Sequence, residues 1–144
     1  MKKVNKHWGH EIWISDGTET PYALKRILFK AGNRTSLQVH KFKFETNYVL
    51  SGYGKLVQSR EPFDIDKFLQ TGMTAAEVEI FESTCLITEL TPDYRFNIKP
   101  GIVHRVIATS DLEFIEVSTP ELDDVYRLQD DQGRTHGRIL YEHR

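Results

Sequence analysis

The sequence contains only one cysteine, Cys85, among its 144 residues. A single thiol excludes an intramolecular disulfide and any zinc site built on several thiolates. Long apolar runs are missing as well, because no stretch approaches the ~20 residues that a membrane-spanning helix needs. The N-terminal segment VNKHWGHEIW is polar and aromatic, without the apolar core of a signal peptide. We therefore expect a cytoplasmic protein that does not enter a membrane.

An excess of either charge is also missing. The 19 lysines and arginines are nearly balanced by 21 aspartates and glutamates, which gives a formal net charge of −2. This balance offers no electrostatic reason to expect binding to nucleic acid or to an anionic membrane. A length of 144 residues suits one domain with its own core. We expect residues 1–144 to form that single domain.

Several short segments alternate apolar and polar residues and are separated by turns rich in glycine, proline and aspartate, which predicts β-strands. The predicted strands are residues 22–30, 36–40, 45–50, 55–58, 85–90, 94–98, 104–108 and 112–118. Residues 4–15, which contain Trp8 and Trp13, predict an arm or hairpin whose tryptophans close one end of the fold. Many short strands with close turns favour an all-β sandwich or barrel.

Two segments depart from this pattern. Residues 61–82 lack the alternation, and Thr74 and Glu77 within them have the spacing of a helix capping box, so we predict a helical insertion. Residues 119–144 are acidic and then basic, and we expect them to form a C-terminal tail that packs on the barrel. Residues 120–124 suit a single helical turn, because proline is common at the first position of a helix.

Four polar side chains form a candidate metal site. Gln38 and His40 are two residues apart, so their side chains lie on the same face of one strand. Glu45 begins the next strand, where opposed side chains are about 5 Å apart, and His104 joins from a more distant strand. Two imidazoles, a carboxylate and an amide oxygen suit a divalent metal such as Zn²⁺, Mn²⁺, Fe²⁺, Co²⁺ or Ni²⁺. Each residue taken singly is an ordinary strand residue, so the metal prediction depends on the four together.

Lys25 occupies an unusual place in the strand predicted over residues 22–30. Alternation puts it in the same row as Ala23, Ile27 and Phe29, and a lysine that faces a core is rare unless it is paired or functional. Three interpretations stay open. A bulge shifts the register, the side chain reaches the rim, or the ammonium faces a substrate.

The spacing of the candidate ligands is similar to the first motif of the cupin family. In this chain the motif is Gly32-x5-Gln38-x-His40-x4-Glu45-x6-Gly52, with glutamine in place of the first histidine. The resemblance implies the cupin fold, an all-β double-stranded β-helix or jelly-roll barrel, here with a short helical insertion.

A second cupin motif is matched only at its centre. Pro100-Gly101-x2-His104 resembles that centre. The glycine that usually opens the motif is missing, and Ala108 stands where an asparagine usually closes it.

Within the cupins, the chain resembles the C-terminal cupin domain of type II, bifunctional mannose-6-phosphate isomerases. The shared features are Gln38 in the first ligand position, Trp8-Gly9, Ala23-Leu24-Lys25-Arg26-Ile27, and the tail Asp123-Asp124-x2-Arg127-x2-Asp130-x2-Gly133-Arg134. The resemblance implies a metal-dependent aldose–ketose isomerase that interconverts mannose 6-phosphate and fructose 6-phosphate, or a related sugar phosphate. No nucleotidyltransferase domain accompanies these motifs, so we expect no nucleotide-sugar synthesis.

The resemblance also implies roles for individual residues. The metal held by the four ligands, with zinc favoured, would stabilise charge on the substrate oxygen. Arg127 and Arg134 would bind the phosphate as guanidinium clamps, and the Ser36 hydroxyl would donate a further hydrogen bond to the substrate. Arg134 would also take part in catalysis. The base is either Lys25 or Glu116. The alternatives are surface salt bridges for the two arginines and a rim carboxylate for Glu116.

Two other functions stay open at this point. One is an Fe-dependent cupin oxygenase, which a pocket without cationic groups would favour. The other is a non-catalytic cupin that binds a sugar. By analogy with barrels that pair through edge strands, we expect a homodimer.

Overall fold

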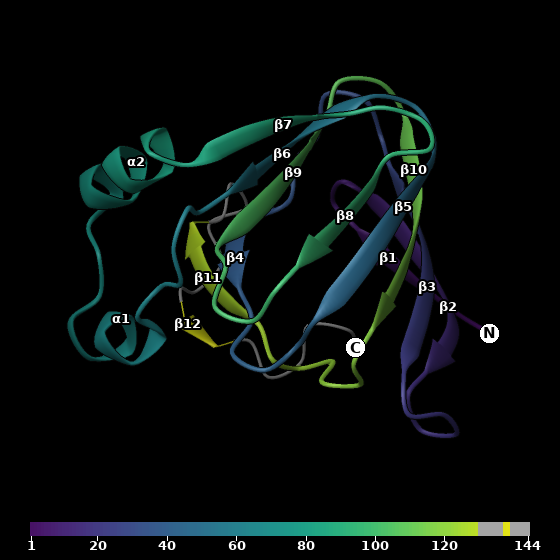
Figure 1. Ribbon diagram of the computed structural model, residues 1–144, viewed down its shortest axis with the longest axis horizontal. Coiled ribbons are helices and arrows are strands. Elements are labelled where there is room, and N and C mark those ends of the chain that lie inside the picture. Colours follow the sequence, from purple (N-terminus) through teal and green to yellow (C-terminus); the bar gives the residue numbers. More distant parts are fainter. Residues whose placement is uncertain (130–136, 139–144) are drawn as a thin grey trace.

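The computed structural model describes residues 1–129 and 137–138, which form two antiparallel sheets. The first sheet has the strand order β1-β2-β3-β10-β5-β8, and the second has the order β12-β11-β4-β9-β6-β7. The strands are β1 (Lys2–Lys6), β2 (Gly9–Asp16), β3 (Ala23–Phe29), β4 (Leu37–Val39), β5 (Glu45–Ser51), β6 (Gly54–Gln58), β7 (Leu86–Leu90), β8 (Arg95–Ile98), β9 (His104–Ala108), β10 (Leu112–Ser118), β11 (Tyr126–Gln129) and β12 (Gly137–Arg138). Figure 1 shows the two sheets around a common interior. The all-β prediction is confirmed.

β3 shows how the alternation of side chains builds this interior. Ala23, Lys25, Ile27 and Phe29 are all buried, and the residues between them are more exposed. β3 pairs with β10 without a break in register from Ala23 to Phe29, and Lys25 is only 2% exposed. A shifted register and a rim-directed side chain are therefore both excluded. Lys25 faces the space between the sheets.

The N-terminal segment forms a hairpin of β1 and β2, as predicted. Trp8, at the turn of this hairpin, is buried and stacks on Phe29, with the ring centroids 4.3 Å apart. Phe29 in turn contacts Phe114 of β10, with a centroid distance of 5.0 Å. Aromatic side chains bury large areas and dominate the energetics of such a core. The hairpin is thus fixed to the interior through Trp8.

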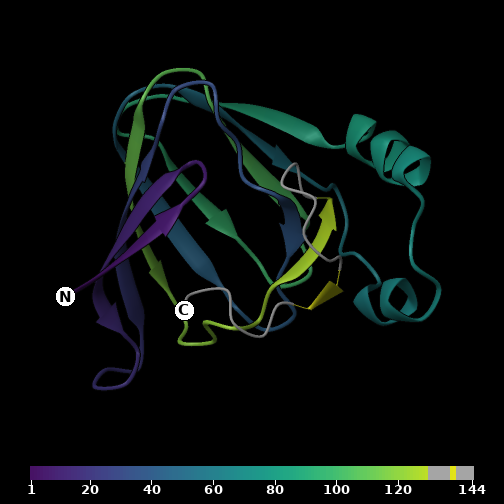
Figure 2. The same cartoon turned by 180° about the vertical axis from the view of Figure 1, so that it is seen from behind.

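Two helices, α1 (Ile65–Thr71) and α2 (Ala75–Ser83), lie between β6 and β7. Their buried side chains Ile65, Phe68 and Val78 pack against Leu37 and Val39 of β4, which places the helices on the outer face of the second sheet. The predicted capping box is present at the start of α2. Both views place the helices on the side of the molecule opposite the N-terminal hairpin (Figures 1 and 2).

The tail returns to the second sheet as β11, which pairs with β4. The single helical turn expected at residues 120–124 is wrong, because the chain has only a turn at residues 122–123. The carboxylate of Asp124 accepts hydrogen bonds from the backbone N–H groups of Lys41, Phe42 and Lys43. These bonds hold Asp124 against the β4–β5 loop and leave the segment extended toward β11. Arg134 lies outside the described residues.

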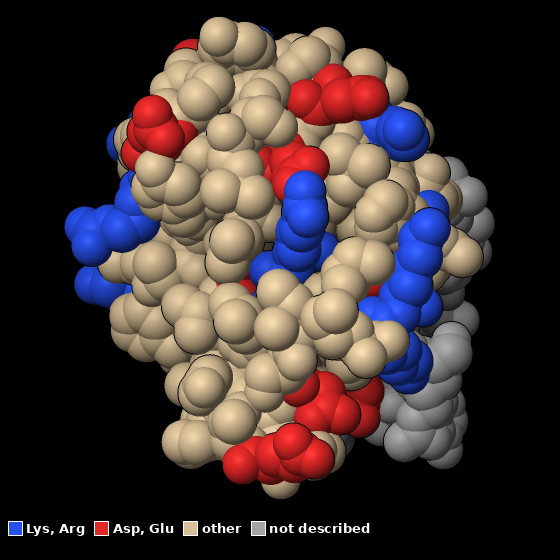
Figure 3. All heavy atoms as spheres, turned by 90° about the vertical axis from the view of Figure 1, so that its right-hand side faces the viewer, with Lys and Arg blue, Asp and Glu red and all other residues tan. Residues whose placement is uncertain are grey.

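The face of the molecule near β2 and β3 carries mostly uncharged residues, with basic and acidic groups close together near its middle (Figure 3). Arg26 of β3 and Glu113 of β10 form an ion pair. Because the two signs are mixed, this face does not present the positive potential that attracts nucleic acid. Within residues 1–129 and 137–138, no helix has the length and apolar character needed to cross a bilayer.

Candidate metal centre

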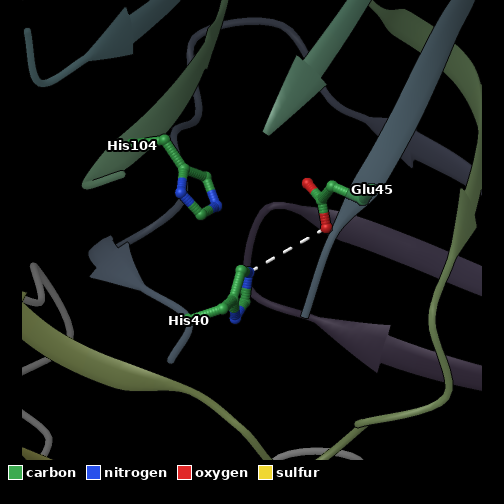
Figure 4. Close-up of side chains that lie close together, drawn as sticks. All are labelled: His40, Glu45 and His104. Atoms are coloured by element: carbon green, nitrogen blue, oxygen red, sulfur yellow. Dashed lines mark ion pairs between the residues drawn. The ribbon is translucent and has the colours of Figure 1, made fainter. Parts of the chain in front are cut away.

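His40, Glu45 and His104 point toward one another inside the barrel (Figure 4). His40 directly follows β4, Glu45 begins β5 and His104 begins β9. One ligand atom from each residue can be chosen so that all three lie within 4.8 Å of one another, and all three residues are buried. His40 Nε2 is 3.9 Å from Glu45 Oε2, and the two imidazole rings have centroids 5.0 Å apart. Two separate sequence motifs therefore meet at one point.

Backbone carbonyls hold both imidazoles by the same ring nitrogen. His40 Nδ1 is 2.7 Å from the carbonyl oxygen of Asp124, and His104 Nδ1 is 3.0 Å from that of Ile102. A carbonyl only accepts, so Nδ1 carries the proton in each ring and donates it. The lone pair of Nε2 is then directed to the cavity, which is how histidine ligands of metals are usually oriented.

Burial keeps both imidazoles neutral. It lowers the pKa of His40 well below its usual value, and the nearby Lys43 ammonium lowers that pKa further. Burial also lowers the pKa of His104, although the Glu45 carboxylate partly opposes this effect. Since a metal binds only the neutral imidazole, both side chains are in the form that a metal ligand requires.

Lys43 neutralises the acidic part of the centre. Its ammonium lies 3.1 Å from Glu45 Oε2 and 3.1 Å from Glu116 Oε2. Burial by itself lowers the pKa of Lys43, but the two carboxylates outweigh burial and raise the pKa above its usual value. Burial likewise raises the pKa of Glu45, and Lys43 reverses this effect so that the pKa is lowered overall. A bound metal would therefore share the charged Glu45 carboxylate with Lys43.

The donor set fits a divalent metal. Two neutral imidazoles and one charged carboxylate without a thiolate suit zinc, manganese, iron, cobalt or nickel. Gln38 stands opposite His104 in the β4–β9 register, and its Oε1 atom accepts a hydrogen bond of 2.9 Å from the Ser36 hydroxyl. Gln38 as the fourth ligand stays a prediction.

Three of the candidate ligands, Gln38, His40 and Glu45, border a small polar cavity of about 70 Å³, and His104 lines the neighbouring one. The lining of the first cavity includes Lys25, Ser36, Gln38, His40, Glu45 and Glu116. A second cavity of about 70 Å³ shares part of this lining and reaches the aromatic core at Phe29 and Phe114. The first cavity is therefore large enough for a metal ion with water beside it.

Lys25 lies at this cavity in a mixed charged and aromatic setting. Its ammonium is 3.6 Å from Glu11 Oε1 and 4.6 Å from the centre of the Trp13 ring. The Trp13 indole N–H donates a 2.8 Å hydrogen bond to the same Glu11 oxygen. Burial lowers the pKa of Lys25 and the Lys43 ammonium lowers it further, while Glu11 opposes them in part. The amine thus has a greater tendency than an exposed lysine to be neutral.

The remaining predicted residues are placed as follows. Glu116 is buried, lines the cavity, and pairs with Lys43 rather than with an arginine. Arg127 is buried in β11 opposite Gln38, so the two side chains leave the sheet on the same face. Arg134 is among the residues that the structure does not describe. The phosphate-binding roles of the two arginines stay predictions.

Comparison with known proteins shows which fold carries this centre. The chain is 31% identical over 139 residues to the xanthan biosynthesis protein XanB of Xanthomonas campestris pv. campestris, which covers 93% of this chain and 24% of XanB. The capsular polysaccharide assembling protein CapF of Staphylococcus aureus matches 90% of this chain and 32% of its own, with a TM-score of 0.63 and 15% identity. A protein with a double-stranded β-helix domain from Klebsiella pneumoniae matches 88% of this chain and 91% of its own, with a TM-score of 0.59 and 16% identity.

The chain has the cupin fold. No known family profile matches the sequence. The chain spans about a quarter of XanB, at 24% of its length, and about a third of CapF, at 32%. The chain thus corresponds to only a part of each of these longer proteins.

Three residues of this cupin centre were not identified from the sequence. Lys43 lies in the β4–β5 loop, where no alternation indicates the direction of a side chain. Glu11 did give a signal, because it shares a face with the buried Trp13 in β2. Asp124 lies in the segment before β11, and its bonds to the β4–β5 loop depend on the folded structure. All three are nevertheless buried.

We expect Asp124→Ala to weaken metal binding to the cupin centre by about 10–100-fold, the range typical of lost outer-shell contacts. The carboxylate fixes the loop that follows His40, and the same residue supplies the carbonyl that orients the His40 ring. Titration calorimetry with Zn²⁺ or Mn²⁺ measures the effect. Asp123→Ala is the matched control, because Asp123 has no hydrogen bond to a described residue. Equal affinities of the two variants would contradict this role of Asp124.

Proposed function

We propose that the chain is a metal-dependent aldose–ketose isomerase acting on a sugar phosphate, with mannose 6-phosphate and fructose 6-phosphate as the substrate pair. The observation that carries the proposal is that two members of the His-His-Glu cluster, His40 and Glu45, line the same cavity as the buried amine of Lys25. XanB is named for xanthan biosynthesis and CapF for capsular polysaccharide assembly, which supports a sugar as the substrate. The inward-facing ammonium groups of Lys25 and Lys43 count against the oxygenase alternative.

The isomerisation moves a proton between C2 and C1 of the sugar through an enediol. A metal held by His40, Glu45 and His104 would supply a Lewis acid for the carbonyl oxygen, where negative charge develops. We assign the base to Lys25, whose pKa is lowered by burial and by Lys43. Its rival Glu116 accepts a hydrogen bond from the Lys43 ammonium, so one of its oxygens is already engaged.

Glu11 and Trp13 fix the position of the Lys25 amine. The Glu11 carboxylate is itself held by the Trp13 indole, so the ammonium has one defined partner on the wall of the cavity. Ser36 holds the Gln38 amide, and this bond orients the Gln38 oxygen near the proposed metal. Arg127 and Arg134 remain the proposed phosphate ligands, and Lys6, which also lines the cavity, offers a further cation.

The test is a coupled assay that detects fructose 6-phosphate formed from mannose 6-phosphate. We expect a chelator to abolish turnover, and at least one of Zn²⁺, Mn²⁺, Fe²⁺, Co²⁺ and Ni²⁺ to restore it. His104→Ala should stay inactive with every metal, because it removes one of the three clustered ligands. His10→Ala is the matched control, since His10 alternates with the inward-facing Glu11 and points away from the cavity. Absence of turnover with all five metals would refute the isomerase.

The homodimer and the cytoplasmic location stay predictions. β7 is the edge of the second sheet, and its residues Leu86 and Ile87 are 46% and 65% exposed. An exposed apolar edge strand is a common place for a second copy to pair. We therefore propose β7 as the dimer edge.

A further inference from the structure

A cavity much larger than the two at the candidate metal centre lies elsewhere in the molecule. It has a volume of about 470 Å³ and lies between the segment after β6 and the two helices α1 and α2. We call it the insertion pocket and define it by Arg60, Phe63, Lys67, Phe68, Met73 and Phe81. It shares no lining residue with the two smaller cavities at the candidate metal centre. Pockets of about 300–1,000 Å³ are typical of small-molecule sites.

One wall of the insertion pocket is aromatic. Phe63 lies against Phe68 and Phe81, with ring centroids 5.7 Å and 5.4 Å apart. Phe68 is also anchored in the core between α1 and β4, and Phe63 and Phe81 are half-buried against that core. The wall is therefore held in place by packing and presents ring surface to the pocket. Such a wall suits an aromatic or branched aliphatic group.

In contrast to the aromatic wall, another part of the pocket lining carries two cations, Arg60 and Lys67. Neither forms an ion pair with a residue in the described part of the chain. The Arg60 Nε–H donates a 3.0 Å hydrogen bond to the carbonyl of Thr84, which fixes the guanidinium group and leaves its terminal nitrogens for a ligand. A positioned guanidinium is well suited to bind a carboxylate or phosphate by two hydrogen bonds.

The carboxylates around the insertion pocket are mostly engaged elsewhere. Asp64 accepts the backbone N–H of Lys67 at the start of α1, and Glu77 accepts the backbone N–H of Thr74 in the capping box. Glu61 is exposed. Two of the three acids thus stabilise helix ends, while the two cations have no such partner. Arg60 and Lys67 are therefore the groups at the polar side of the pocket that can bind an anionic group directly.

Backbone hydrogen bonds connect the insertion pocket to the candidate metal centre. Ser59, which also lines the pocket, bonds to both the N–H and the carbonyl of Val103, the residue before His104. The Phe63 N–H donates to the Gly101 carbonyl, and the Gly101 N–H donates to the carbonyl of His40. A ligand that shifts Ser59 or Phe63 would thus move the backbone that carries both histidines.

We propose that the insertion pocket is a second ligand site, which binds a small molecule with one carboxylate or phosphate group on an aromatic body and thereby changes the metal affinity of the barrel. The aromatic wall takes the ring, and Arg60 and Lys67 take the anion. This site is independent of the proposed isomerase reaction, because it uses none of the residues assigned to that reaction.

The test uses 2-naphthoate as the anionic probe and 2-naphthylmethanol as its neutral analogue. Calorimetry is carried out on the full chain treated with chelator, so that the carboxylate has no metal to bind. We expect 2-naphthoate to bind at least about 10-fold more tightly than the alcohol, because a hydrogen bond to a charged group is typically worth that factor or more. Equal binding of the two probes, or no binding of either, would overturn the proposal.

Two variants locate the site. Arg60→Gln combined with Lys67→Gln should reduce 2-naphthoate binding to the level of the alcohol, and Thr71→Trp should block both probes by filling the pocket, which Thr71 lines. Lys30→Gln combined with Lys55→Gln is the matched control, since Lys30 is exposed, Lys55 is half-exposed, and both lie outside the pocket. Thermal melting confirms that each variant is folded. Unchanged 2-naphthoate binding in the pocket variants would place the probe elsewhere and overturn the assignment.

The effect on the metal centre has its own measurement. We expect the Kd for Zn²⁺ or Mn²⁺ to change at least about 5-fold in saturating 2-naphthoate, the lower end of the usual range of coupling between sites. The Arg60→Gln, Lys67→Gln protein should show no such change, which separates the pocket from direct binding of 2-naphthoate to the metal. An unchanged Kd in the wild-type protein would refute the connection between the two sites.

Discussion

Lys25→Met is expected to lower kcat for mannose 6-phosphate by about 10²–10⁴-fold, the contribution that a positioned general base typically makes. The methionine keeps an unbranched side chain in the buried space but removes the amine that faces the cavity. Because Lys25 is not among the clustered metal ligands, metal affinity should stay close to that of the wild type. The coupled assay gives kcat and KM, and calorimetry gives the metal affinity of the same preparations.

A structural role of Lys25 has to be separated from its role as a base. Replacement of Lys25 takes one cation away from the buried Glu11 carboxylate, and the loss of a buried ion pair is costly. Lys25→Met combined with Glu11→Gln removes this charge, and the amide oxygen of glutamine can still accept from the Trp13 indole. If Lys25 is the base, the double variant is stable but remains slow. Recovery of kcat in the double variant would show that Lys25 acts only by neutralising Glu11.

The pH profile offers a second readout. A base must be neutral to accept a proton, so wild-type kcat should rise with pH as Lys25 loses its proton. Burial and Lys43 lower the pKa of Lys25, and this rise should therefore lie below the pH at which an exposed lysine titrates. Lys25→Met should lack this rise, whereas Lys55→Met, at a half-exposed lysine of β6, should keep it. A rise that persists in Lys25→Met would assign the base to another group.

The interior of the barrel was predictable where the strands are regular. In β3 and β10, alternation alone placed Lys25 and Glu116 on inward faces, and the structure buries both residues. The spacing of the two histidines and Glu45 predicted their convergence, because each residue lies at the end of a strand. The alternation of side chains along a strand depends only on local sequence. It correctly predicts which residues are buried where only one face of the strand meets the core.

The same rule fails on the second sheet, because both of its faces are covered. Alternation in β9 would direct Arg105 to solvent, opposite the inward-facing His104. Arg105 is instead fully buried, and its guanidinium binds Glu82 of α2. The helices of the insertion thus convert an outer face into a second core. Which face an insertion covers depends on tertiary packing, and no local pattern in residues 61–82 indicates it.

Lys43, at the candidate metal centre, is a second residue whose direction no local sequence pattern predicts. It lies in an irregular loop, and its direction is set by contacts with Glu45 and with the distant Glu116. The motif spacing predicted the candidate ligands but not the cation that lies beside Glu45. Electrostatic balance in a buried site depends on residues from several segments, and only the folded structure brings them together.

Lys43→Met is expected to lower the free energy of unfolding by about 3–5 kcal/mol, the usual cost of breaking a buried ion pair by removing one partner. Lys43, Glu45 and Glu116 are all less than 10% exposed, so two carboxylates lose their cation in a region with little water. Urea denaturation in the presence of chelator measures the change. Lys41→Met is the matched control. Lys41 pairs with Asp66 at the surface, where both side chains are well exposed, and its loss should cost at most about 1 kcal/mol.

A second substitution tests whether unbalanced charge causes the loss of stability in Lys43→Met. Lys43→Met combined with Glu116→Gln removes one of the two unpaired carboxylates, so it should be more stable than Lys43→Met alone. Added Zn²⁺ or Mn²⁺ should also restore part of the lost stability, because the metal then neutralises the Glu45 carboxylate, which it no longer shares with the ammonium. A Lys43→Met protein as stable as Lys41→Met, or one that metal does not stabilise, would show that Lys43 does not balance the charge of the centre.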